Sequence, residues 1–181
     1  FGLNDEPGPL IVAGSTHPGE EQMLMDALRR IRRTPGLENT RLLLAPRHPE
    51  RFNAVAQLAE QNGFTIRRRT DIPNENRDAA ILLLDTLGEL AAVYRFATIA
   101  FVGGSLFRHG GHSILEPAMH SKAIVVGPSM ENFRSIVEDF LMQGGIRQIR
   151  AGEENRDLQE QQLLDVFLQL LQNAEEREKL G

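Results

Sequence analysis

Short apolar runs alternate with amphipathic segments along the whole of this 181-residue chain. The runs are continuously apolar, as expected for strands of a parallel sheet that helices cover on both faces. Strands are predicted at residues 10–13, 41–45, 65–69, 80–84, 99–102, 123–126 and 146–149. Helices are predicted at 20–33, 50–62, 87–96, 114–120, 132–143 and 158–173, with a polar loop at 71–78. About six βα units indicate one α/β domain with a Rossmann-like, doubly wound parallel sheet.

Composition excludes several classes of function. Hydrophobic residues make up 41% and charged residues 25%, which is typical of one globular domain. The net charge of −5 argues against a nucleic-acid partner, since phosphate binding requires a basic surface. The runs Arg29–Arg33 and Arg67–Arg69 are interpreted as solvated faces, with contact to anionic lipid as the alternative. The chain has no cysteine, and its five histidines lack a metal-binding spacing, so no metal or cofactor is expected.

The predicted strands place several loops at the same edge of the sheet. Ligands of such folds bind beyond the carboxyl ends of the strands. The loops that follow strands are residues 14–19, 46–49, 85–89, 103–113 and 127–132. We therefore expect one shared binding site along this edge.

The glycine-rich loop after the strand at 99–102 carries most of the chemical signal. Four glycines at 103, 104, 110 and 111 let the backbone approach a ligand closely. A helix beginning just beyond them would present free amides to a phosphate. Glu116, in the first turn of that helix, can accept hydrogen bonds from sugar hydroxyls. Phosphate donors beside a hydroxyl acceptor predict a nucleotide-sugar site, whereas the alternative is a surface turn with an acid that complements the helix dipole.

The other loops at this edge also carry candidate groups. Arg47 follows a strand between prolines 46 and 49 and suits a phosphate or carboxylate, while His48 is interpreted as structural. Thr86 and Glu89 are predicted to form a capping box at the start of the 87–96 helix.

The loop after the first strand leaves its role open. Ser15, Thr16 and His17 either bind phosphate or cap the following helix. The segment Gly19-Glu20-Glu21 is interpreted as a solvated helix start that the helix dipole favours.

Taken together, these motifs resemble the C-terminal half of the bacterial 3-deoxy-D-manno-octulosonate (Kdo) transferases. They occur in the family's order and cover roughly residues 10 to 140. Together they are specific, although each alone is weak. The segments that carry the resemblance are Ser15-Thr16-His17 with Gly19-Glu20-Glu21, Pro46-Arg47-His48-Pro49-Glu50-Arg51-Phe52, Asp85-Thr86-Leu87-Gly88-Glu89-Leu90, Phe101-Val102-Gly103-Gly104-Ser105-Leu106, Gly110-Gly111-His112-Ser113-Ile114-Leu115-Glu116-Pro117, Gly127-Pro128 and Asn132-Phe133.

The resemblance implies a GT-B glycosyltransferase, in which two Rossmann-like domains face a cleft. Such an enzyme transfers Kdo from CMP-Kdo to a lipid A precursor in lipopolysaccharide biosynthesis, at the cytoplasmic face of the inner membrane. The reaction inverts the anomeric centre and needs no bound metal. Residues 1–181 would form the soluble donor-binding domain. The base, the acceptor site and the membrane contact would belong to an N-terminal domain that this chain lacks, so the fragment alone is expected to be inactive.

The resemblance also assigns residues. Nucleotide contacts are expected from Pro46, Arg47, Leu87, Gly88, Glu89, Ser113, Ile114, Leu115 and Glu116, and further phosphate or donor contacts from Ser15, Thr16, His17, Gly104, Gly110 and Gly111. The family usually has Asn-Pro where this chain has Ser113-Ile114, and commonly methionine at position 87.

Two alternative functions remain at this point. One is a GT-B domain that uses a UDP- or GDP-sugar. The other is a non-catalytic domain of the same fold that binds or senses a nucleotide.

Overall fold

The computed structural model of the protein describes residues 1, 3, 8–71 and 78–181. Most of the loop predicted at 71–78 therefore lies outside the described residues. Seven parallel strands form one sheet in the order β3-β4-β2-β1-β5-β6-β7. Their bounds are β1 (Leu10–Thr16), β2 (Arg41–Pro46), β3 (Ile66–Arg68), β4 (Ile81–Leu83), β5 (Ile99–Val102), β6 (Ala123–Val126) and β7 (Ile146–Gln148). This confirms the predicted α/β fold with a parallel sheet.

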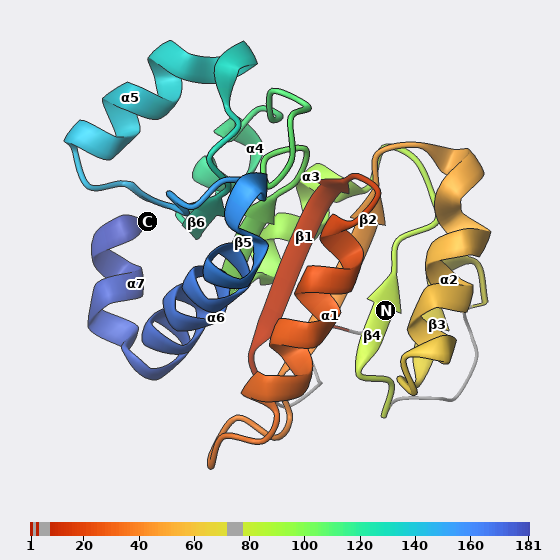
Figure 1. The fold of residues 1–181 in the computed structure, drawn as a ribbon. Helices are drawn as coiled ribbons and strands as arrows, with labels where there is room; N and C mark the ends of the chain where they lie inside the picture. Colours follow the sequence, from red (N-terminus) through yellow and green to blue (C-terminus); the bar gives the residue numbers. More distant parts are fainter. Residues whose placement is uncertain (2, 4–7, 72–77) are drawn as a thin grey trace.

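Helices cover both faces of the sheet, which explains the continuous apolar runs (Figure 1). In β1, Ile11 and Ala13 pack on one face, while Leu10 and Val12 pack on the other. The first face is covered by α1 (Glu20–Ile31), α2 (Phe52–Gln61), α6 (Arg156–Gln172) and α7 (Ala174–Leu180). The second face is covered by α3 (Leu90–Val93), α4 (Leu115–Ala118) and α5 (Arg134–Met142). Short 3-10 helices are η1 (Pro49–Arg51), η2 (Arg69–Asp71), η3 (Tyr94–Phe96), η4 (Glu131–Phe133) and η5 (Glu153–Asn155).

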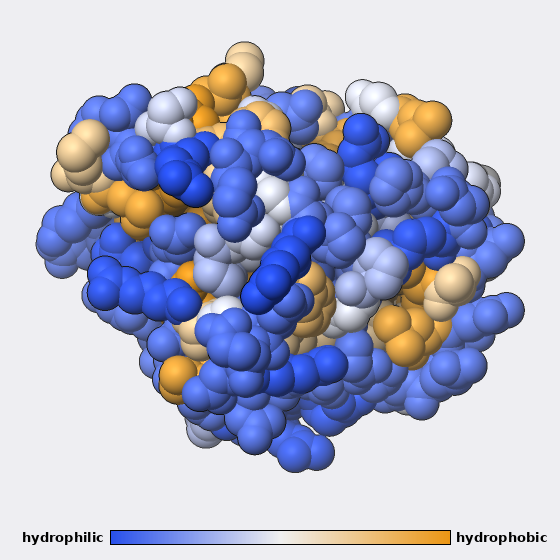
Figure 2. All heavy atoms as spheres, turned by 45° about the horizontal axis from the view of Figure 1, so that its top comes forward, coloured by the Kyte–Doolittle hydropathy of each residue, from blue (hydrophilic) through white to orange (hydrophobic). Residues whose placement is uncertain are grey.

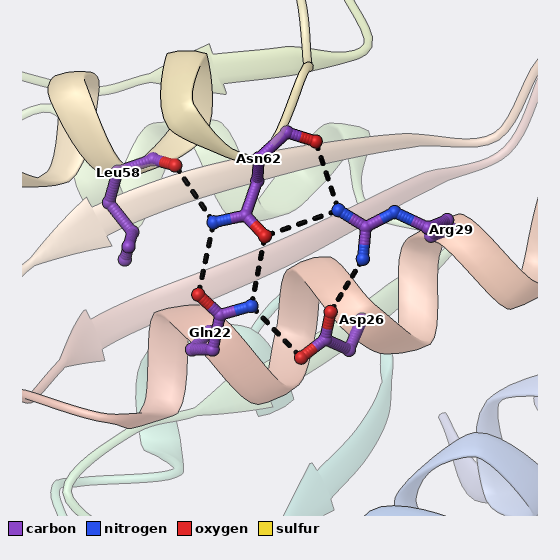
Figure 3. A network of polar contacts seen from close by, with 5 residues as sticks. All are labelled: Gln22, Asp26, Arg29, Leu58 and Asn62. Carbon is purple, nitrogen blue, oxygen red and sulfur yellow. Dashed lines mark hydrogen bonds and ion pairs between the residues drawn. The ribbon is translucent and has the colours of Figure 1, made fainter.

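A polar network fixes α1 against the end of α2 (Figure 3). Asn62, which follows α2, donates to the carbonyl of Leu58 and exchanges hydrogen bonds with Gln22. Arg29 donates to both the backbone and the side chain of Asn62 and pairs with Asp26. The network shows that Arg29, within a basic run interpreted as a solvated face, has a structural role.

Helix ends differ from the predicted ones at several places. The segment predicted as a helix at 87–96 is helical only from Leu90, as α3 followed by η3. The helix predicted at 114–120 is the single turn of α4. The last helix starts at Arg156, and α7, which the sequence did not predict, follows it directly. Asn155 and Asn173 cap α6 and α7, since each side chain accepts an amide hydrogen bond from its helix.

The strand order indicates at which point of the sheet a ligand would bind. The chain runs from β1 to β2 on one side of the sheet and reaches β5 on the other side of β1, so the order reverses between β1 and β5. Open α/β sheets bind ligands at such a switch point, beyond the carboxyl ends of the strands. These ends lie at the top of Figure 1, which Figure 2 turns forward. The surface there is mostly hydrophilic, with apolar residues in separate patches (Figure 2).

Candidate functional site at the carboxyl edge of the sheet

A buried carboxylate at the start of α1 holds the loops after β1 and β5 together. Glu20 is fully buried. Its oxygens accept hydrogen bonds from the amides of His17, Gly104, Ser105 and Leu106, at 2.8–2.9 Å. Burial raises the pKa of Glu20, and this outweighs the four amide hydrogen bonds, which lower it. The carboxylate is thus the anchor of the glycine-rich loop.

The interpretation of Glu20 and Glu21 as a solvated helix start is therefore wrong. Both are fully buried. Glu21 forms a bidentate ion pair with Arg51, at 2.8 and 3.0 Å, and Arg51 also donates to the carbonyl of Thr16. The charges were predicted to face water, but they join α1 to the loops after β1 and β2.

The glycine-rich loop is held by bonds within the protein. The amide of Gly104 donates to Glu20, that of Gly110 to the Ser129 hydroxyl, and that of Gly111 to the carbonyl of Gly104. These three amides, expected to contact the donor, are already engaged. The glycines instead serve the loop itself, because each has a positive φ and none carries a Cβ that would block close packing. A Cβ at Gly110, for example, would lie 2.2 Å from Nδ2 of Asn132.

Arg47 is an exposed cation at this edge. It follows Pro46, the last residue of β2, and its amide donates to the carbonyl of Thr16 at 3.0 Å. This hydrogen bond fixes its backbone to the end of β1. Within the described residues, the Arg47 side chain has no carboxylate partner, so the guanidinium is available to an anion. His48 lies beside it, with Nδ1 3.9 Å from Glu50.

The loop after β4 is fixed by two arginines of the β3 segment. Asp85 accepts hydrogen bonds from Arg68 and from Thr70, at 2.6–3.0 Å. Burial raises its pKa, but the bonds from Thr70 and Arg68 outweigh this and lower it overall. Arg69 pairs with Glu89 through two bonds, at 3.0 and 3.1 Å. The interpretation of this basic run as a solvated face is therefore wrong.

The predicted capping box at Thr86 and Glu89 is also absent. Glu89 itself occupies the N-cap position of α3, and the Thr86 hydroxyl donates to the Glu89 carboxylate at 2.5 Å. That bond and the bonds from Arg69 lower the pKa of Glu89. Between these residues, Leu87 is 75% exposed and Gly88 has open space where a side chain would begin. The loop thus presents an unobstructed backbone on a fixed frame.

The turn into α4 divides its residues between core and surface. Ile114 is fully buried, so any ligand contact it makes comes from its backbone. The Ser113 hydroxyl accepts a bond from the amide of Leu115 at 3.3 Å. The side chains of Leu115 and Glu116 are exposed. Burial raises the pKa of the Tyr94 phenol, and the negative charge of nearby Glu116 raises it further.

Four histidines meet between these loops. His17 lies at the centre, with its ring stacked on His109 at 4.3 Å and on His112 at 5.2 Å, and edge-on to His48 at 5.5 Å between centroids. The Nε2 atoms of His17 and His112 are 2.9 Å apart. Among the residues that the structure describes, no group of three or more His, Asp or Glu is placed to hold a metal ion. The sequence contains these histidines in three separate motifs and shows no spacing that would group them.

Most predicted site residues do lie at one edge, as the parallel sheet requires. Among these candidates, the Thr16 side chain is fully buried, as is that of Ile114, and the Thr16 hydroxyl has no partner among the described residues. Ser15 has φ 54°, an uncommon left-handed conformation for serine, and forms a bulge at the end of β1. Residues that sequence reasoning missed are the supports: Glu20, Glu21, Arg51, Arg68, Arg69, Ser129 and Asn132.

The chain resembles known proteins in both sequence and structure. No family model matches it. It is 36% identical, over 96% of its length, to 3-deoxy-D-manno-octulosonic acid transferase of Haemophilus influenzae, and 32% identical over 80% to the protein of that name from Rickettsia bellii. The chain spans 38% and 34% of the lengths of these relatives.

A solved structure matches nearly the whole chain. It is the C-terminal CMP-Kdo binding domain of WaaA from Acinetobacter baumannii, with a TM-score of 0.85 and 31% identity. The match covers 98% of this chain and 86% of that domain. The likeness therefore extends across nearly all of this chain and most of that domain. The chain belongs to the 3-deoxy-D-manno-octulosonic acid transferase family and corresponds to its C-terminal domain.

Proposed function

We propose that the chain is the donor-binding domain of an inverting glycosyltransferase that transfers Kdo from CMP-Kdo to a lipid A precursor in lipopolysaccharide biosynthesis. The match to a CMP-Kdo binding domain carries this proposal, because it combines 31% identity with nearly complete coverage of both chains. The relatives named as Kdo transferases support the same activity for the whole protein.

The geometry suggests a role for each loop in holding CMP. The exposed guanidinium of Arg47, which has no carboxylate partner in the described part of the chain, suits the phosphate, with which it can form two parallel hydrogen bonds. The open backbone at Leu87 and Gly88 suits the edge of the cytosine base, since no side chain obstructs it there. The exposed carboxylate of Glu116 suits the ribose hydroxyls, which donate to it. Glu89 would act as a support, since Arg69 and Thr86 already occupy its oxygens.

Catalysis would need the remainder of the enzyme. A base from an N-terminal domain would take the proton of the acceptor hydroxyl, and that oxygen would attack the anomeric carbon of Kdo as CMP leaves. This chain would hold the leaving CMP, and Arg47 would offset the charge on its phosphate without a metal ion. The acceptor and the cytoplasmic membrane surface would meet the other domain. Among the described residues of this chain, no helix is long and apolar enough to cross a membrane.

Titration calorimetry with CMP, CDP, UMP and GMP tests the proposal. We expect CMP to bind more tightly than UMP or GMP, because the base is read by fixed backbone groups at 87–89. Glu116→Gln should weaken CMP binding and have less effect on 2′,3′-dideoxy-CMP, which lacks the ribose hydroxyls. A preference for UMP or GMP would instead indicate a UDP- or GDP-sugar donor. Absence of binding by the folded chain would contradict donor binding altogether.

A further inference from the structure

The histidine cluster of His17, His48, His109 and His112 lies between the loops after β1, β2 and β5, at the switch point of the sheet. His48 and His109 are exposed, while His17 and His112 are partly buried. A ligand can therefore reach the cluster from solvent. None of the roles proposed above for CMP uses these rings.

The bond between His17 and His112 restricts the protonation of both rings. Their Nε2 atoms are 2.9 Å apart, so one Nε2 carries a proton and donates a hydrogen bond, and the other Nε2 accepts that hydrogen bond. If both nitrogens were protonated, two donors would face each other and the bond would break. Two such donors could converge on a single oxygen of an anion. The observed pair is thus compatible with a proton on only one of the two Nε2 atoms.

The charges around the cluster are mostly positive. Arg47 lies near His112 and Arg51 near His17, and both disfavour charged imidazoles. The buried acid Glu20 accepts a bond from the amide of His17, and amides occupy both of its oxygens. Glu50 stands 3.9 Å from His48 at the rim. An incoming anion would therefore find several donors and little competing negative charge.

We propose that the histidine cluster is an oxyanion subsite that takes up protons when the donor binds. The oxyanion is either the phosphate of the nucleotide or the carboxylate of the sugar acid attached to it. As the anion enters, the Nε2–H groups of His17 and His112 turn from each other to its oxygens, and Arg47 closes one side. Two further observations fit a ligand here: the strained φ of Ser15, two residues before His17, and the buried hydroxyl of Thr16, which has no hydrogen-bond partner among the described residues.

The electrostatics support this reading. Burial, followed by the neighbouring His109, His112, His48 and Arg51, lowers the pKa of His17 to about 4. Burial and then Arg47, His48 and His109 lower the pKa of His112 as well. Both rings are therefore neutral at pH 7 without a ligand. An anion in contact with them raises both pKa values, so that binding is coupled to proton uptake.

Calorimetry in buffers of different ionisation enthalpy measures the number of protons taken up at pH 6.5. The ligands are cytidine, CMP and CMP-N-acetylneuraminate, a stable CMP-linked sugar acid. Uptake with CMP but not cytidine identifies the phosphate as the oxyanion, and uptake only with the sugar acid identifies the carboxylate. No proton uptake with any ligand that binds overturns the proposal. This inference rests on the proposed function only for the identity of the ligand, so binding heat tests that function and proton uptake tests the subsite.

Inorganic phosphate tests the subsite without a nucleotide. In ¹⁵N-detected spectra of the five histidine rings, phosphate should shift His17 and His112 toward the protonated form and leave His120 unchanged. His120 is a matched control, since its Nε2 is 2.9 Å from the Ala91 carbonyl, outside the cluster. His17→Gln and His112→Gln should each weaken the binding of ligands that carry a phosphate or a carboxylate roughly tenfold, and should abolish proton uptake. Unshifted rings with phosphate, or an equal loss of proton uptake in His120→Gln, would contradict the proposal.

Discussion

The carboxylate of Glu20 accepts a 2.8 Å hydrogen bond from the amide of Gly104, which joins the first helix to the loop after the fifth strand. The two residues are 84 positions apart in the chain. The same carboxylate also binds the amide of His17 and two further amides of the loop. The two sides of the switch point are thus held by one buried side chain.

Glu20→Gln should destabilise the protein by about 2–4 kcal/mol, because its NH₂ group would face amide donors that it cannot satisfy. The free energy of unfolding in urea measures this loss. Glu60→Gln is the matched control, since Glu60 is exposed on α2. Equal stability of the two variants would show that Glu20 does not anchor the loop.

Arg47→Ala should weaken CMP binding about 10- to 100-fold, as expected for the loss of a charge-assisted contact to phosphate. Its side chain has no carboxylate partner among the described residues, so we expect little change in stability. Arg33→Ala, at another exposed position, controls for the change in net charge. If cytidine and CMP lost affinity equally in Arg47→Ala, the arginine would not contact the phosphate.

Stability should fall as the pH falls from about 6.5 toward 4. The pKa of His17 drops from 6.5 in the unfolded chain to about 4 in the fold, so the unfolded chain binds more protons in this window. His112 acts in the same direction. The stability that the neutral His17 ring contributes is fully present above pH 6.5, and it is lost as the pH falls through the folded pKa of about 4. Urea titrations at several pH values should show a shallower fall in this window for His17→Gln than for His120→Gln; identical slopes would refute the assignment.

Gly127→Ala should be more disruptive than Gly144→Ala, although only Gly144 has a positive φ. A Cβ at Gly127 would lie 2.1 Å from the carbonyl oxygen of Ser105, in the backbone of the glycine-rich loop. A Cβ at Gly144 would meet open space, so Gly144→Ala should lower the unfolding free energy only by the backbone strain, about 1 kcal/mol. We expect about 2–3 kcal/mol or more for Gly127→Ala. Unfolding free energies compare the two, and a larger loss in Gly144→Ala would contradict the packing seen here.

Much of the fold could be predicted from local sequence pattern. The apolar runs predicted all seven strands, and the glycines and prolines after them located the loops. The ends of short elements were less certain, because tertiary bonds fix them: Arg69 and Thr86 hold Glu89 where a helix start was expected. The sequence correctly suggested that loops after several strands share one edge.

The supports of the site could not be predicted, because each joins residues far apart in the chain. Glu20 and Glu21 lie in the first turn of α1, where acids usually face water, and only the three-dimensional packing shows that both are buried. The pairing of His17 with His112 spans 95 positions and has no local signal. The sequence predicted that the amides of Gly104, Gly110 and Gly111 would be available to a ligand, but each donates a hydrogen bond within the protein.

We propose that the loops at 46–49, 87–89 and 113–116 together hold one CMP molecule. Backbone ¹H–¹⁵N spectra recorded during a titration with CMP test this most directly. We predict that shifts concentrate in all three loops, saturate with a single dissociation constant, and are weaker with UMP at the 87–89 amides. Shifts confined to one loop, scattered over the helices, or identical for CMP and UMP would contradict it.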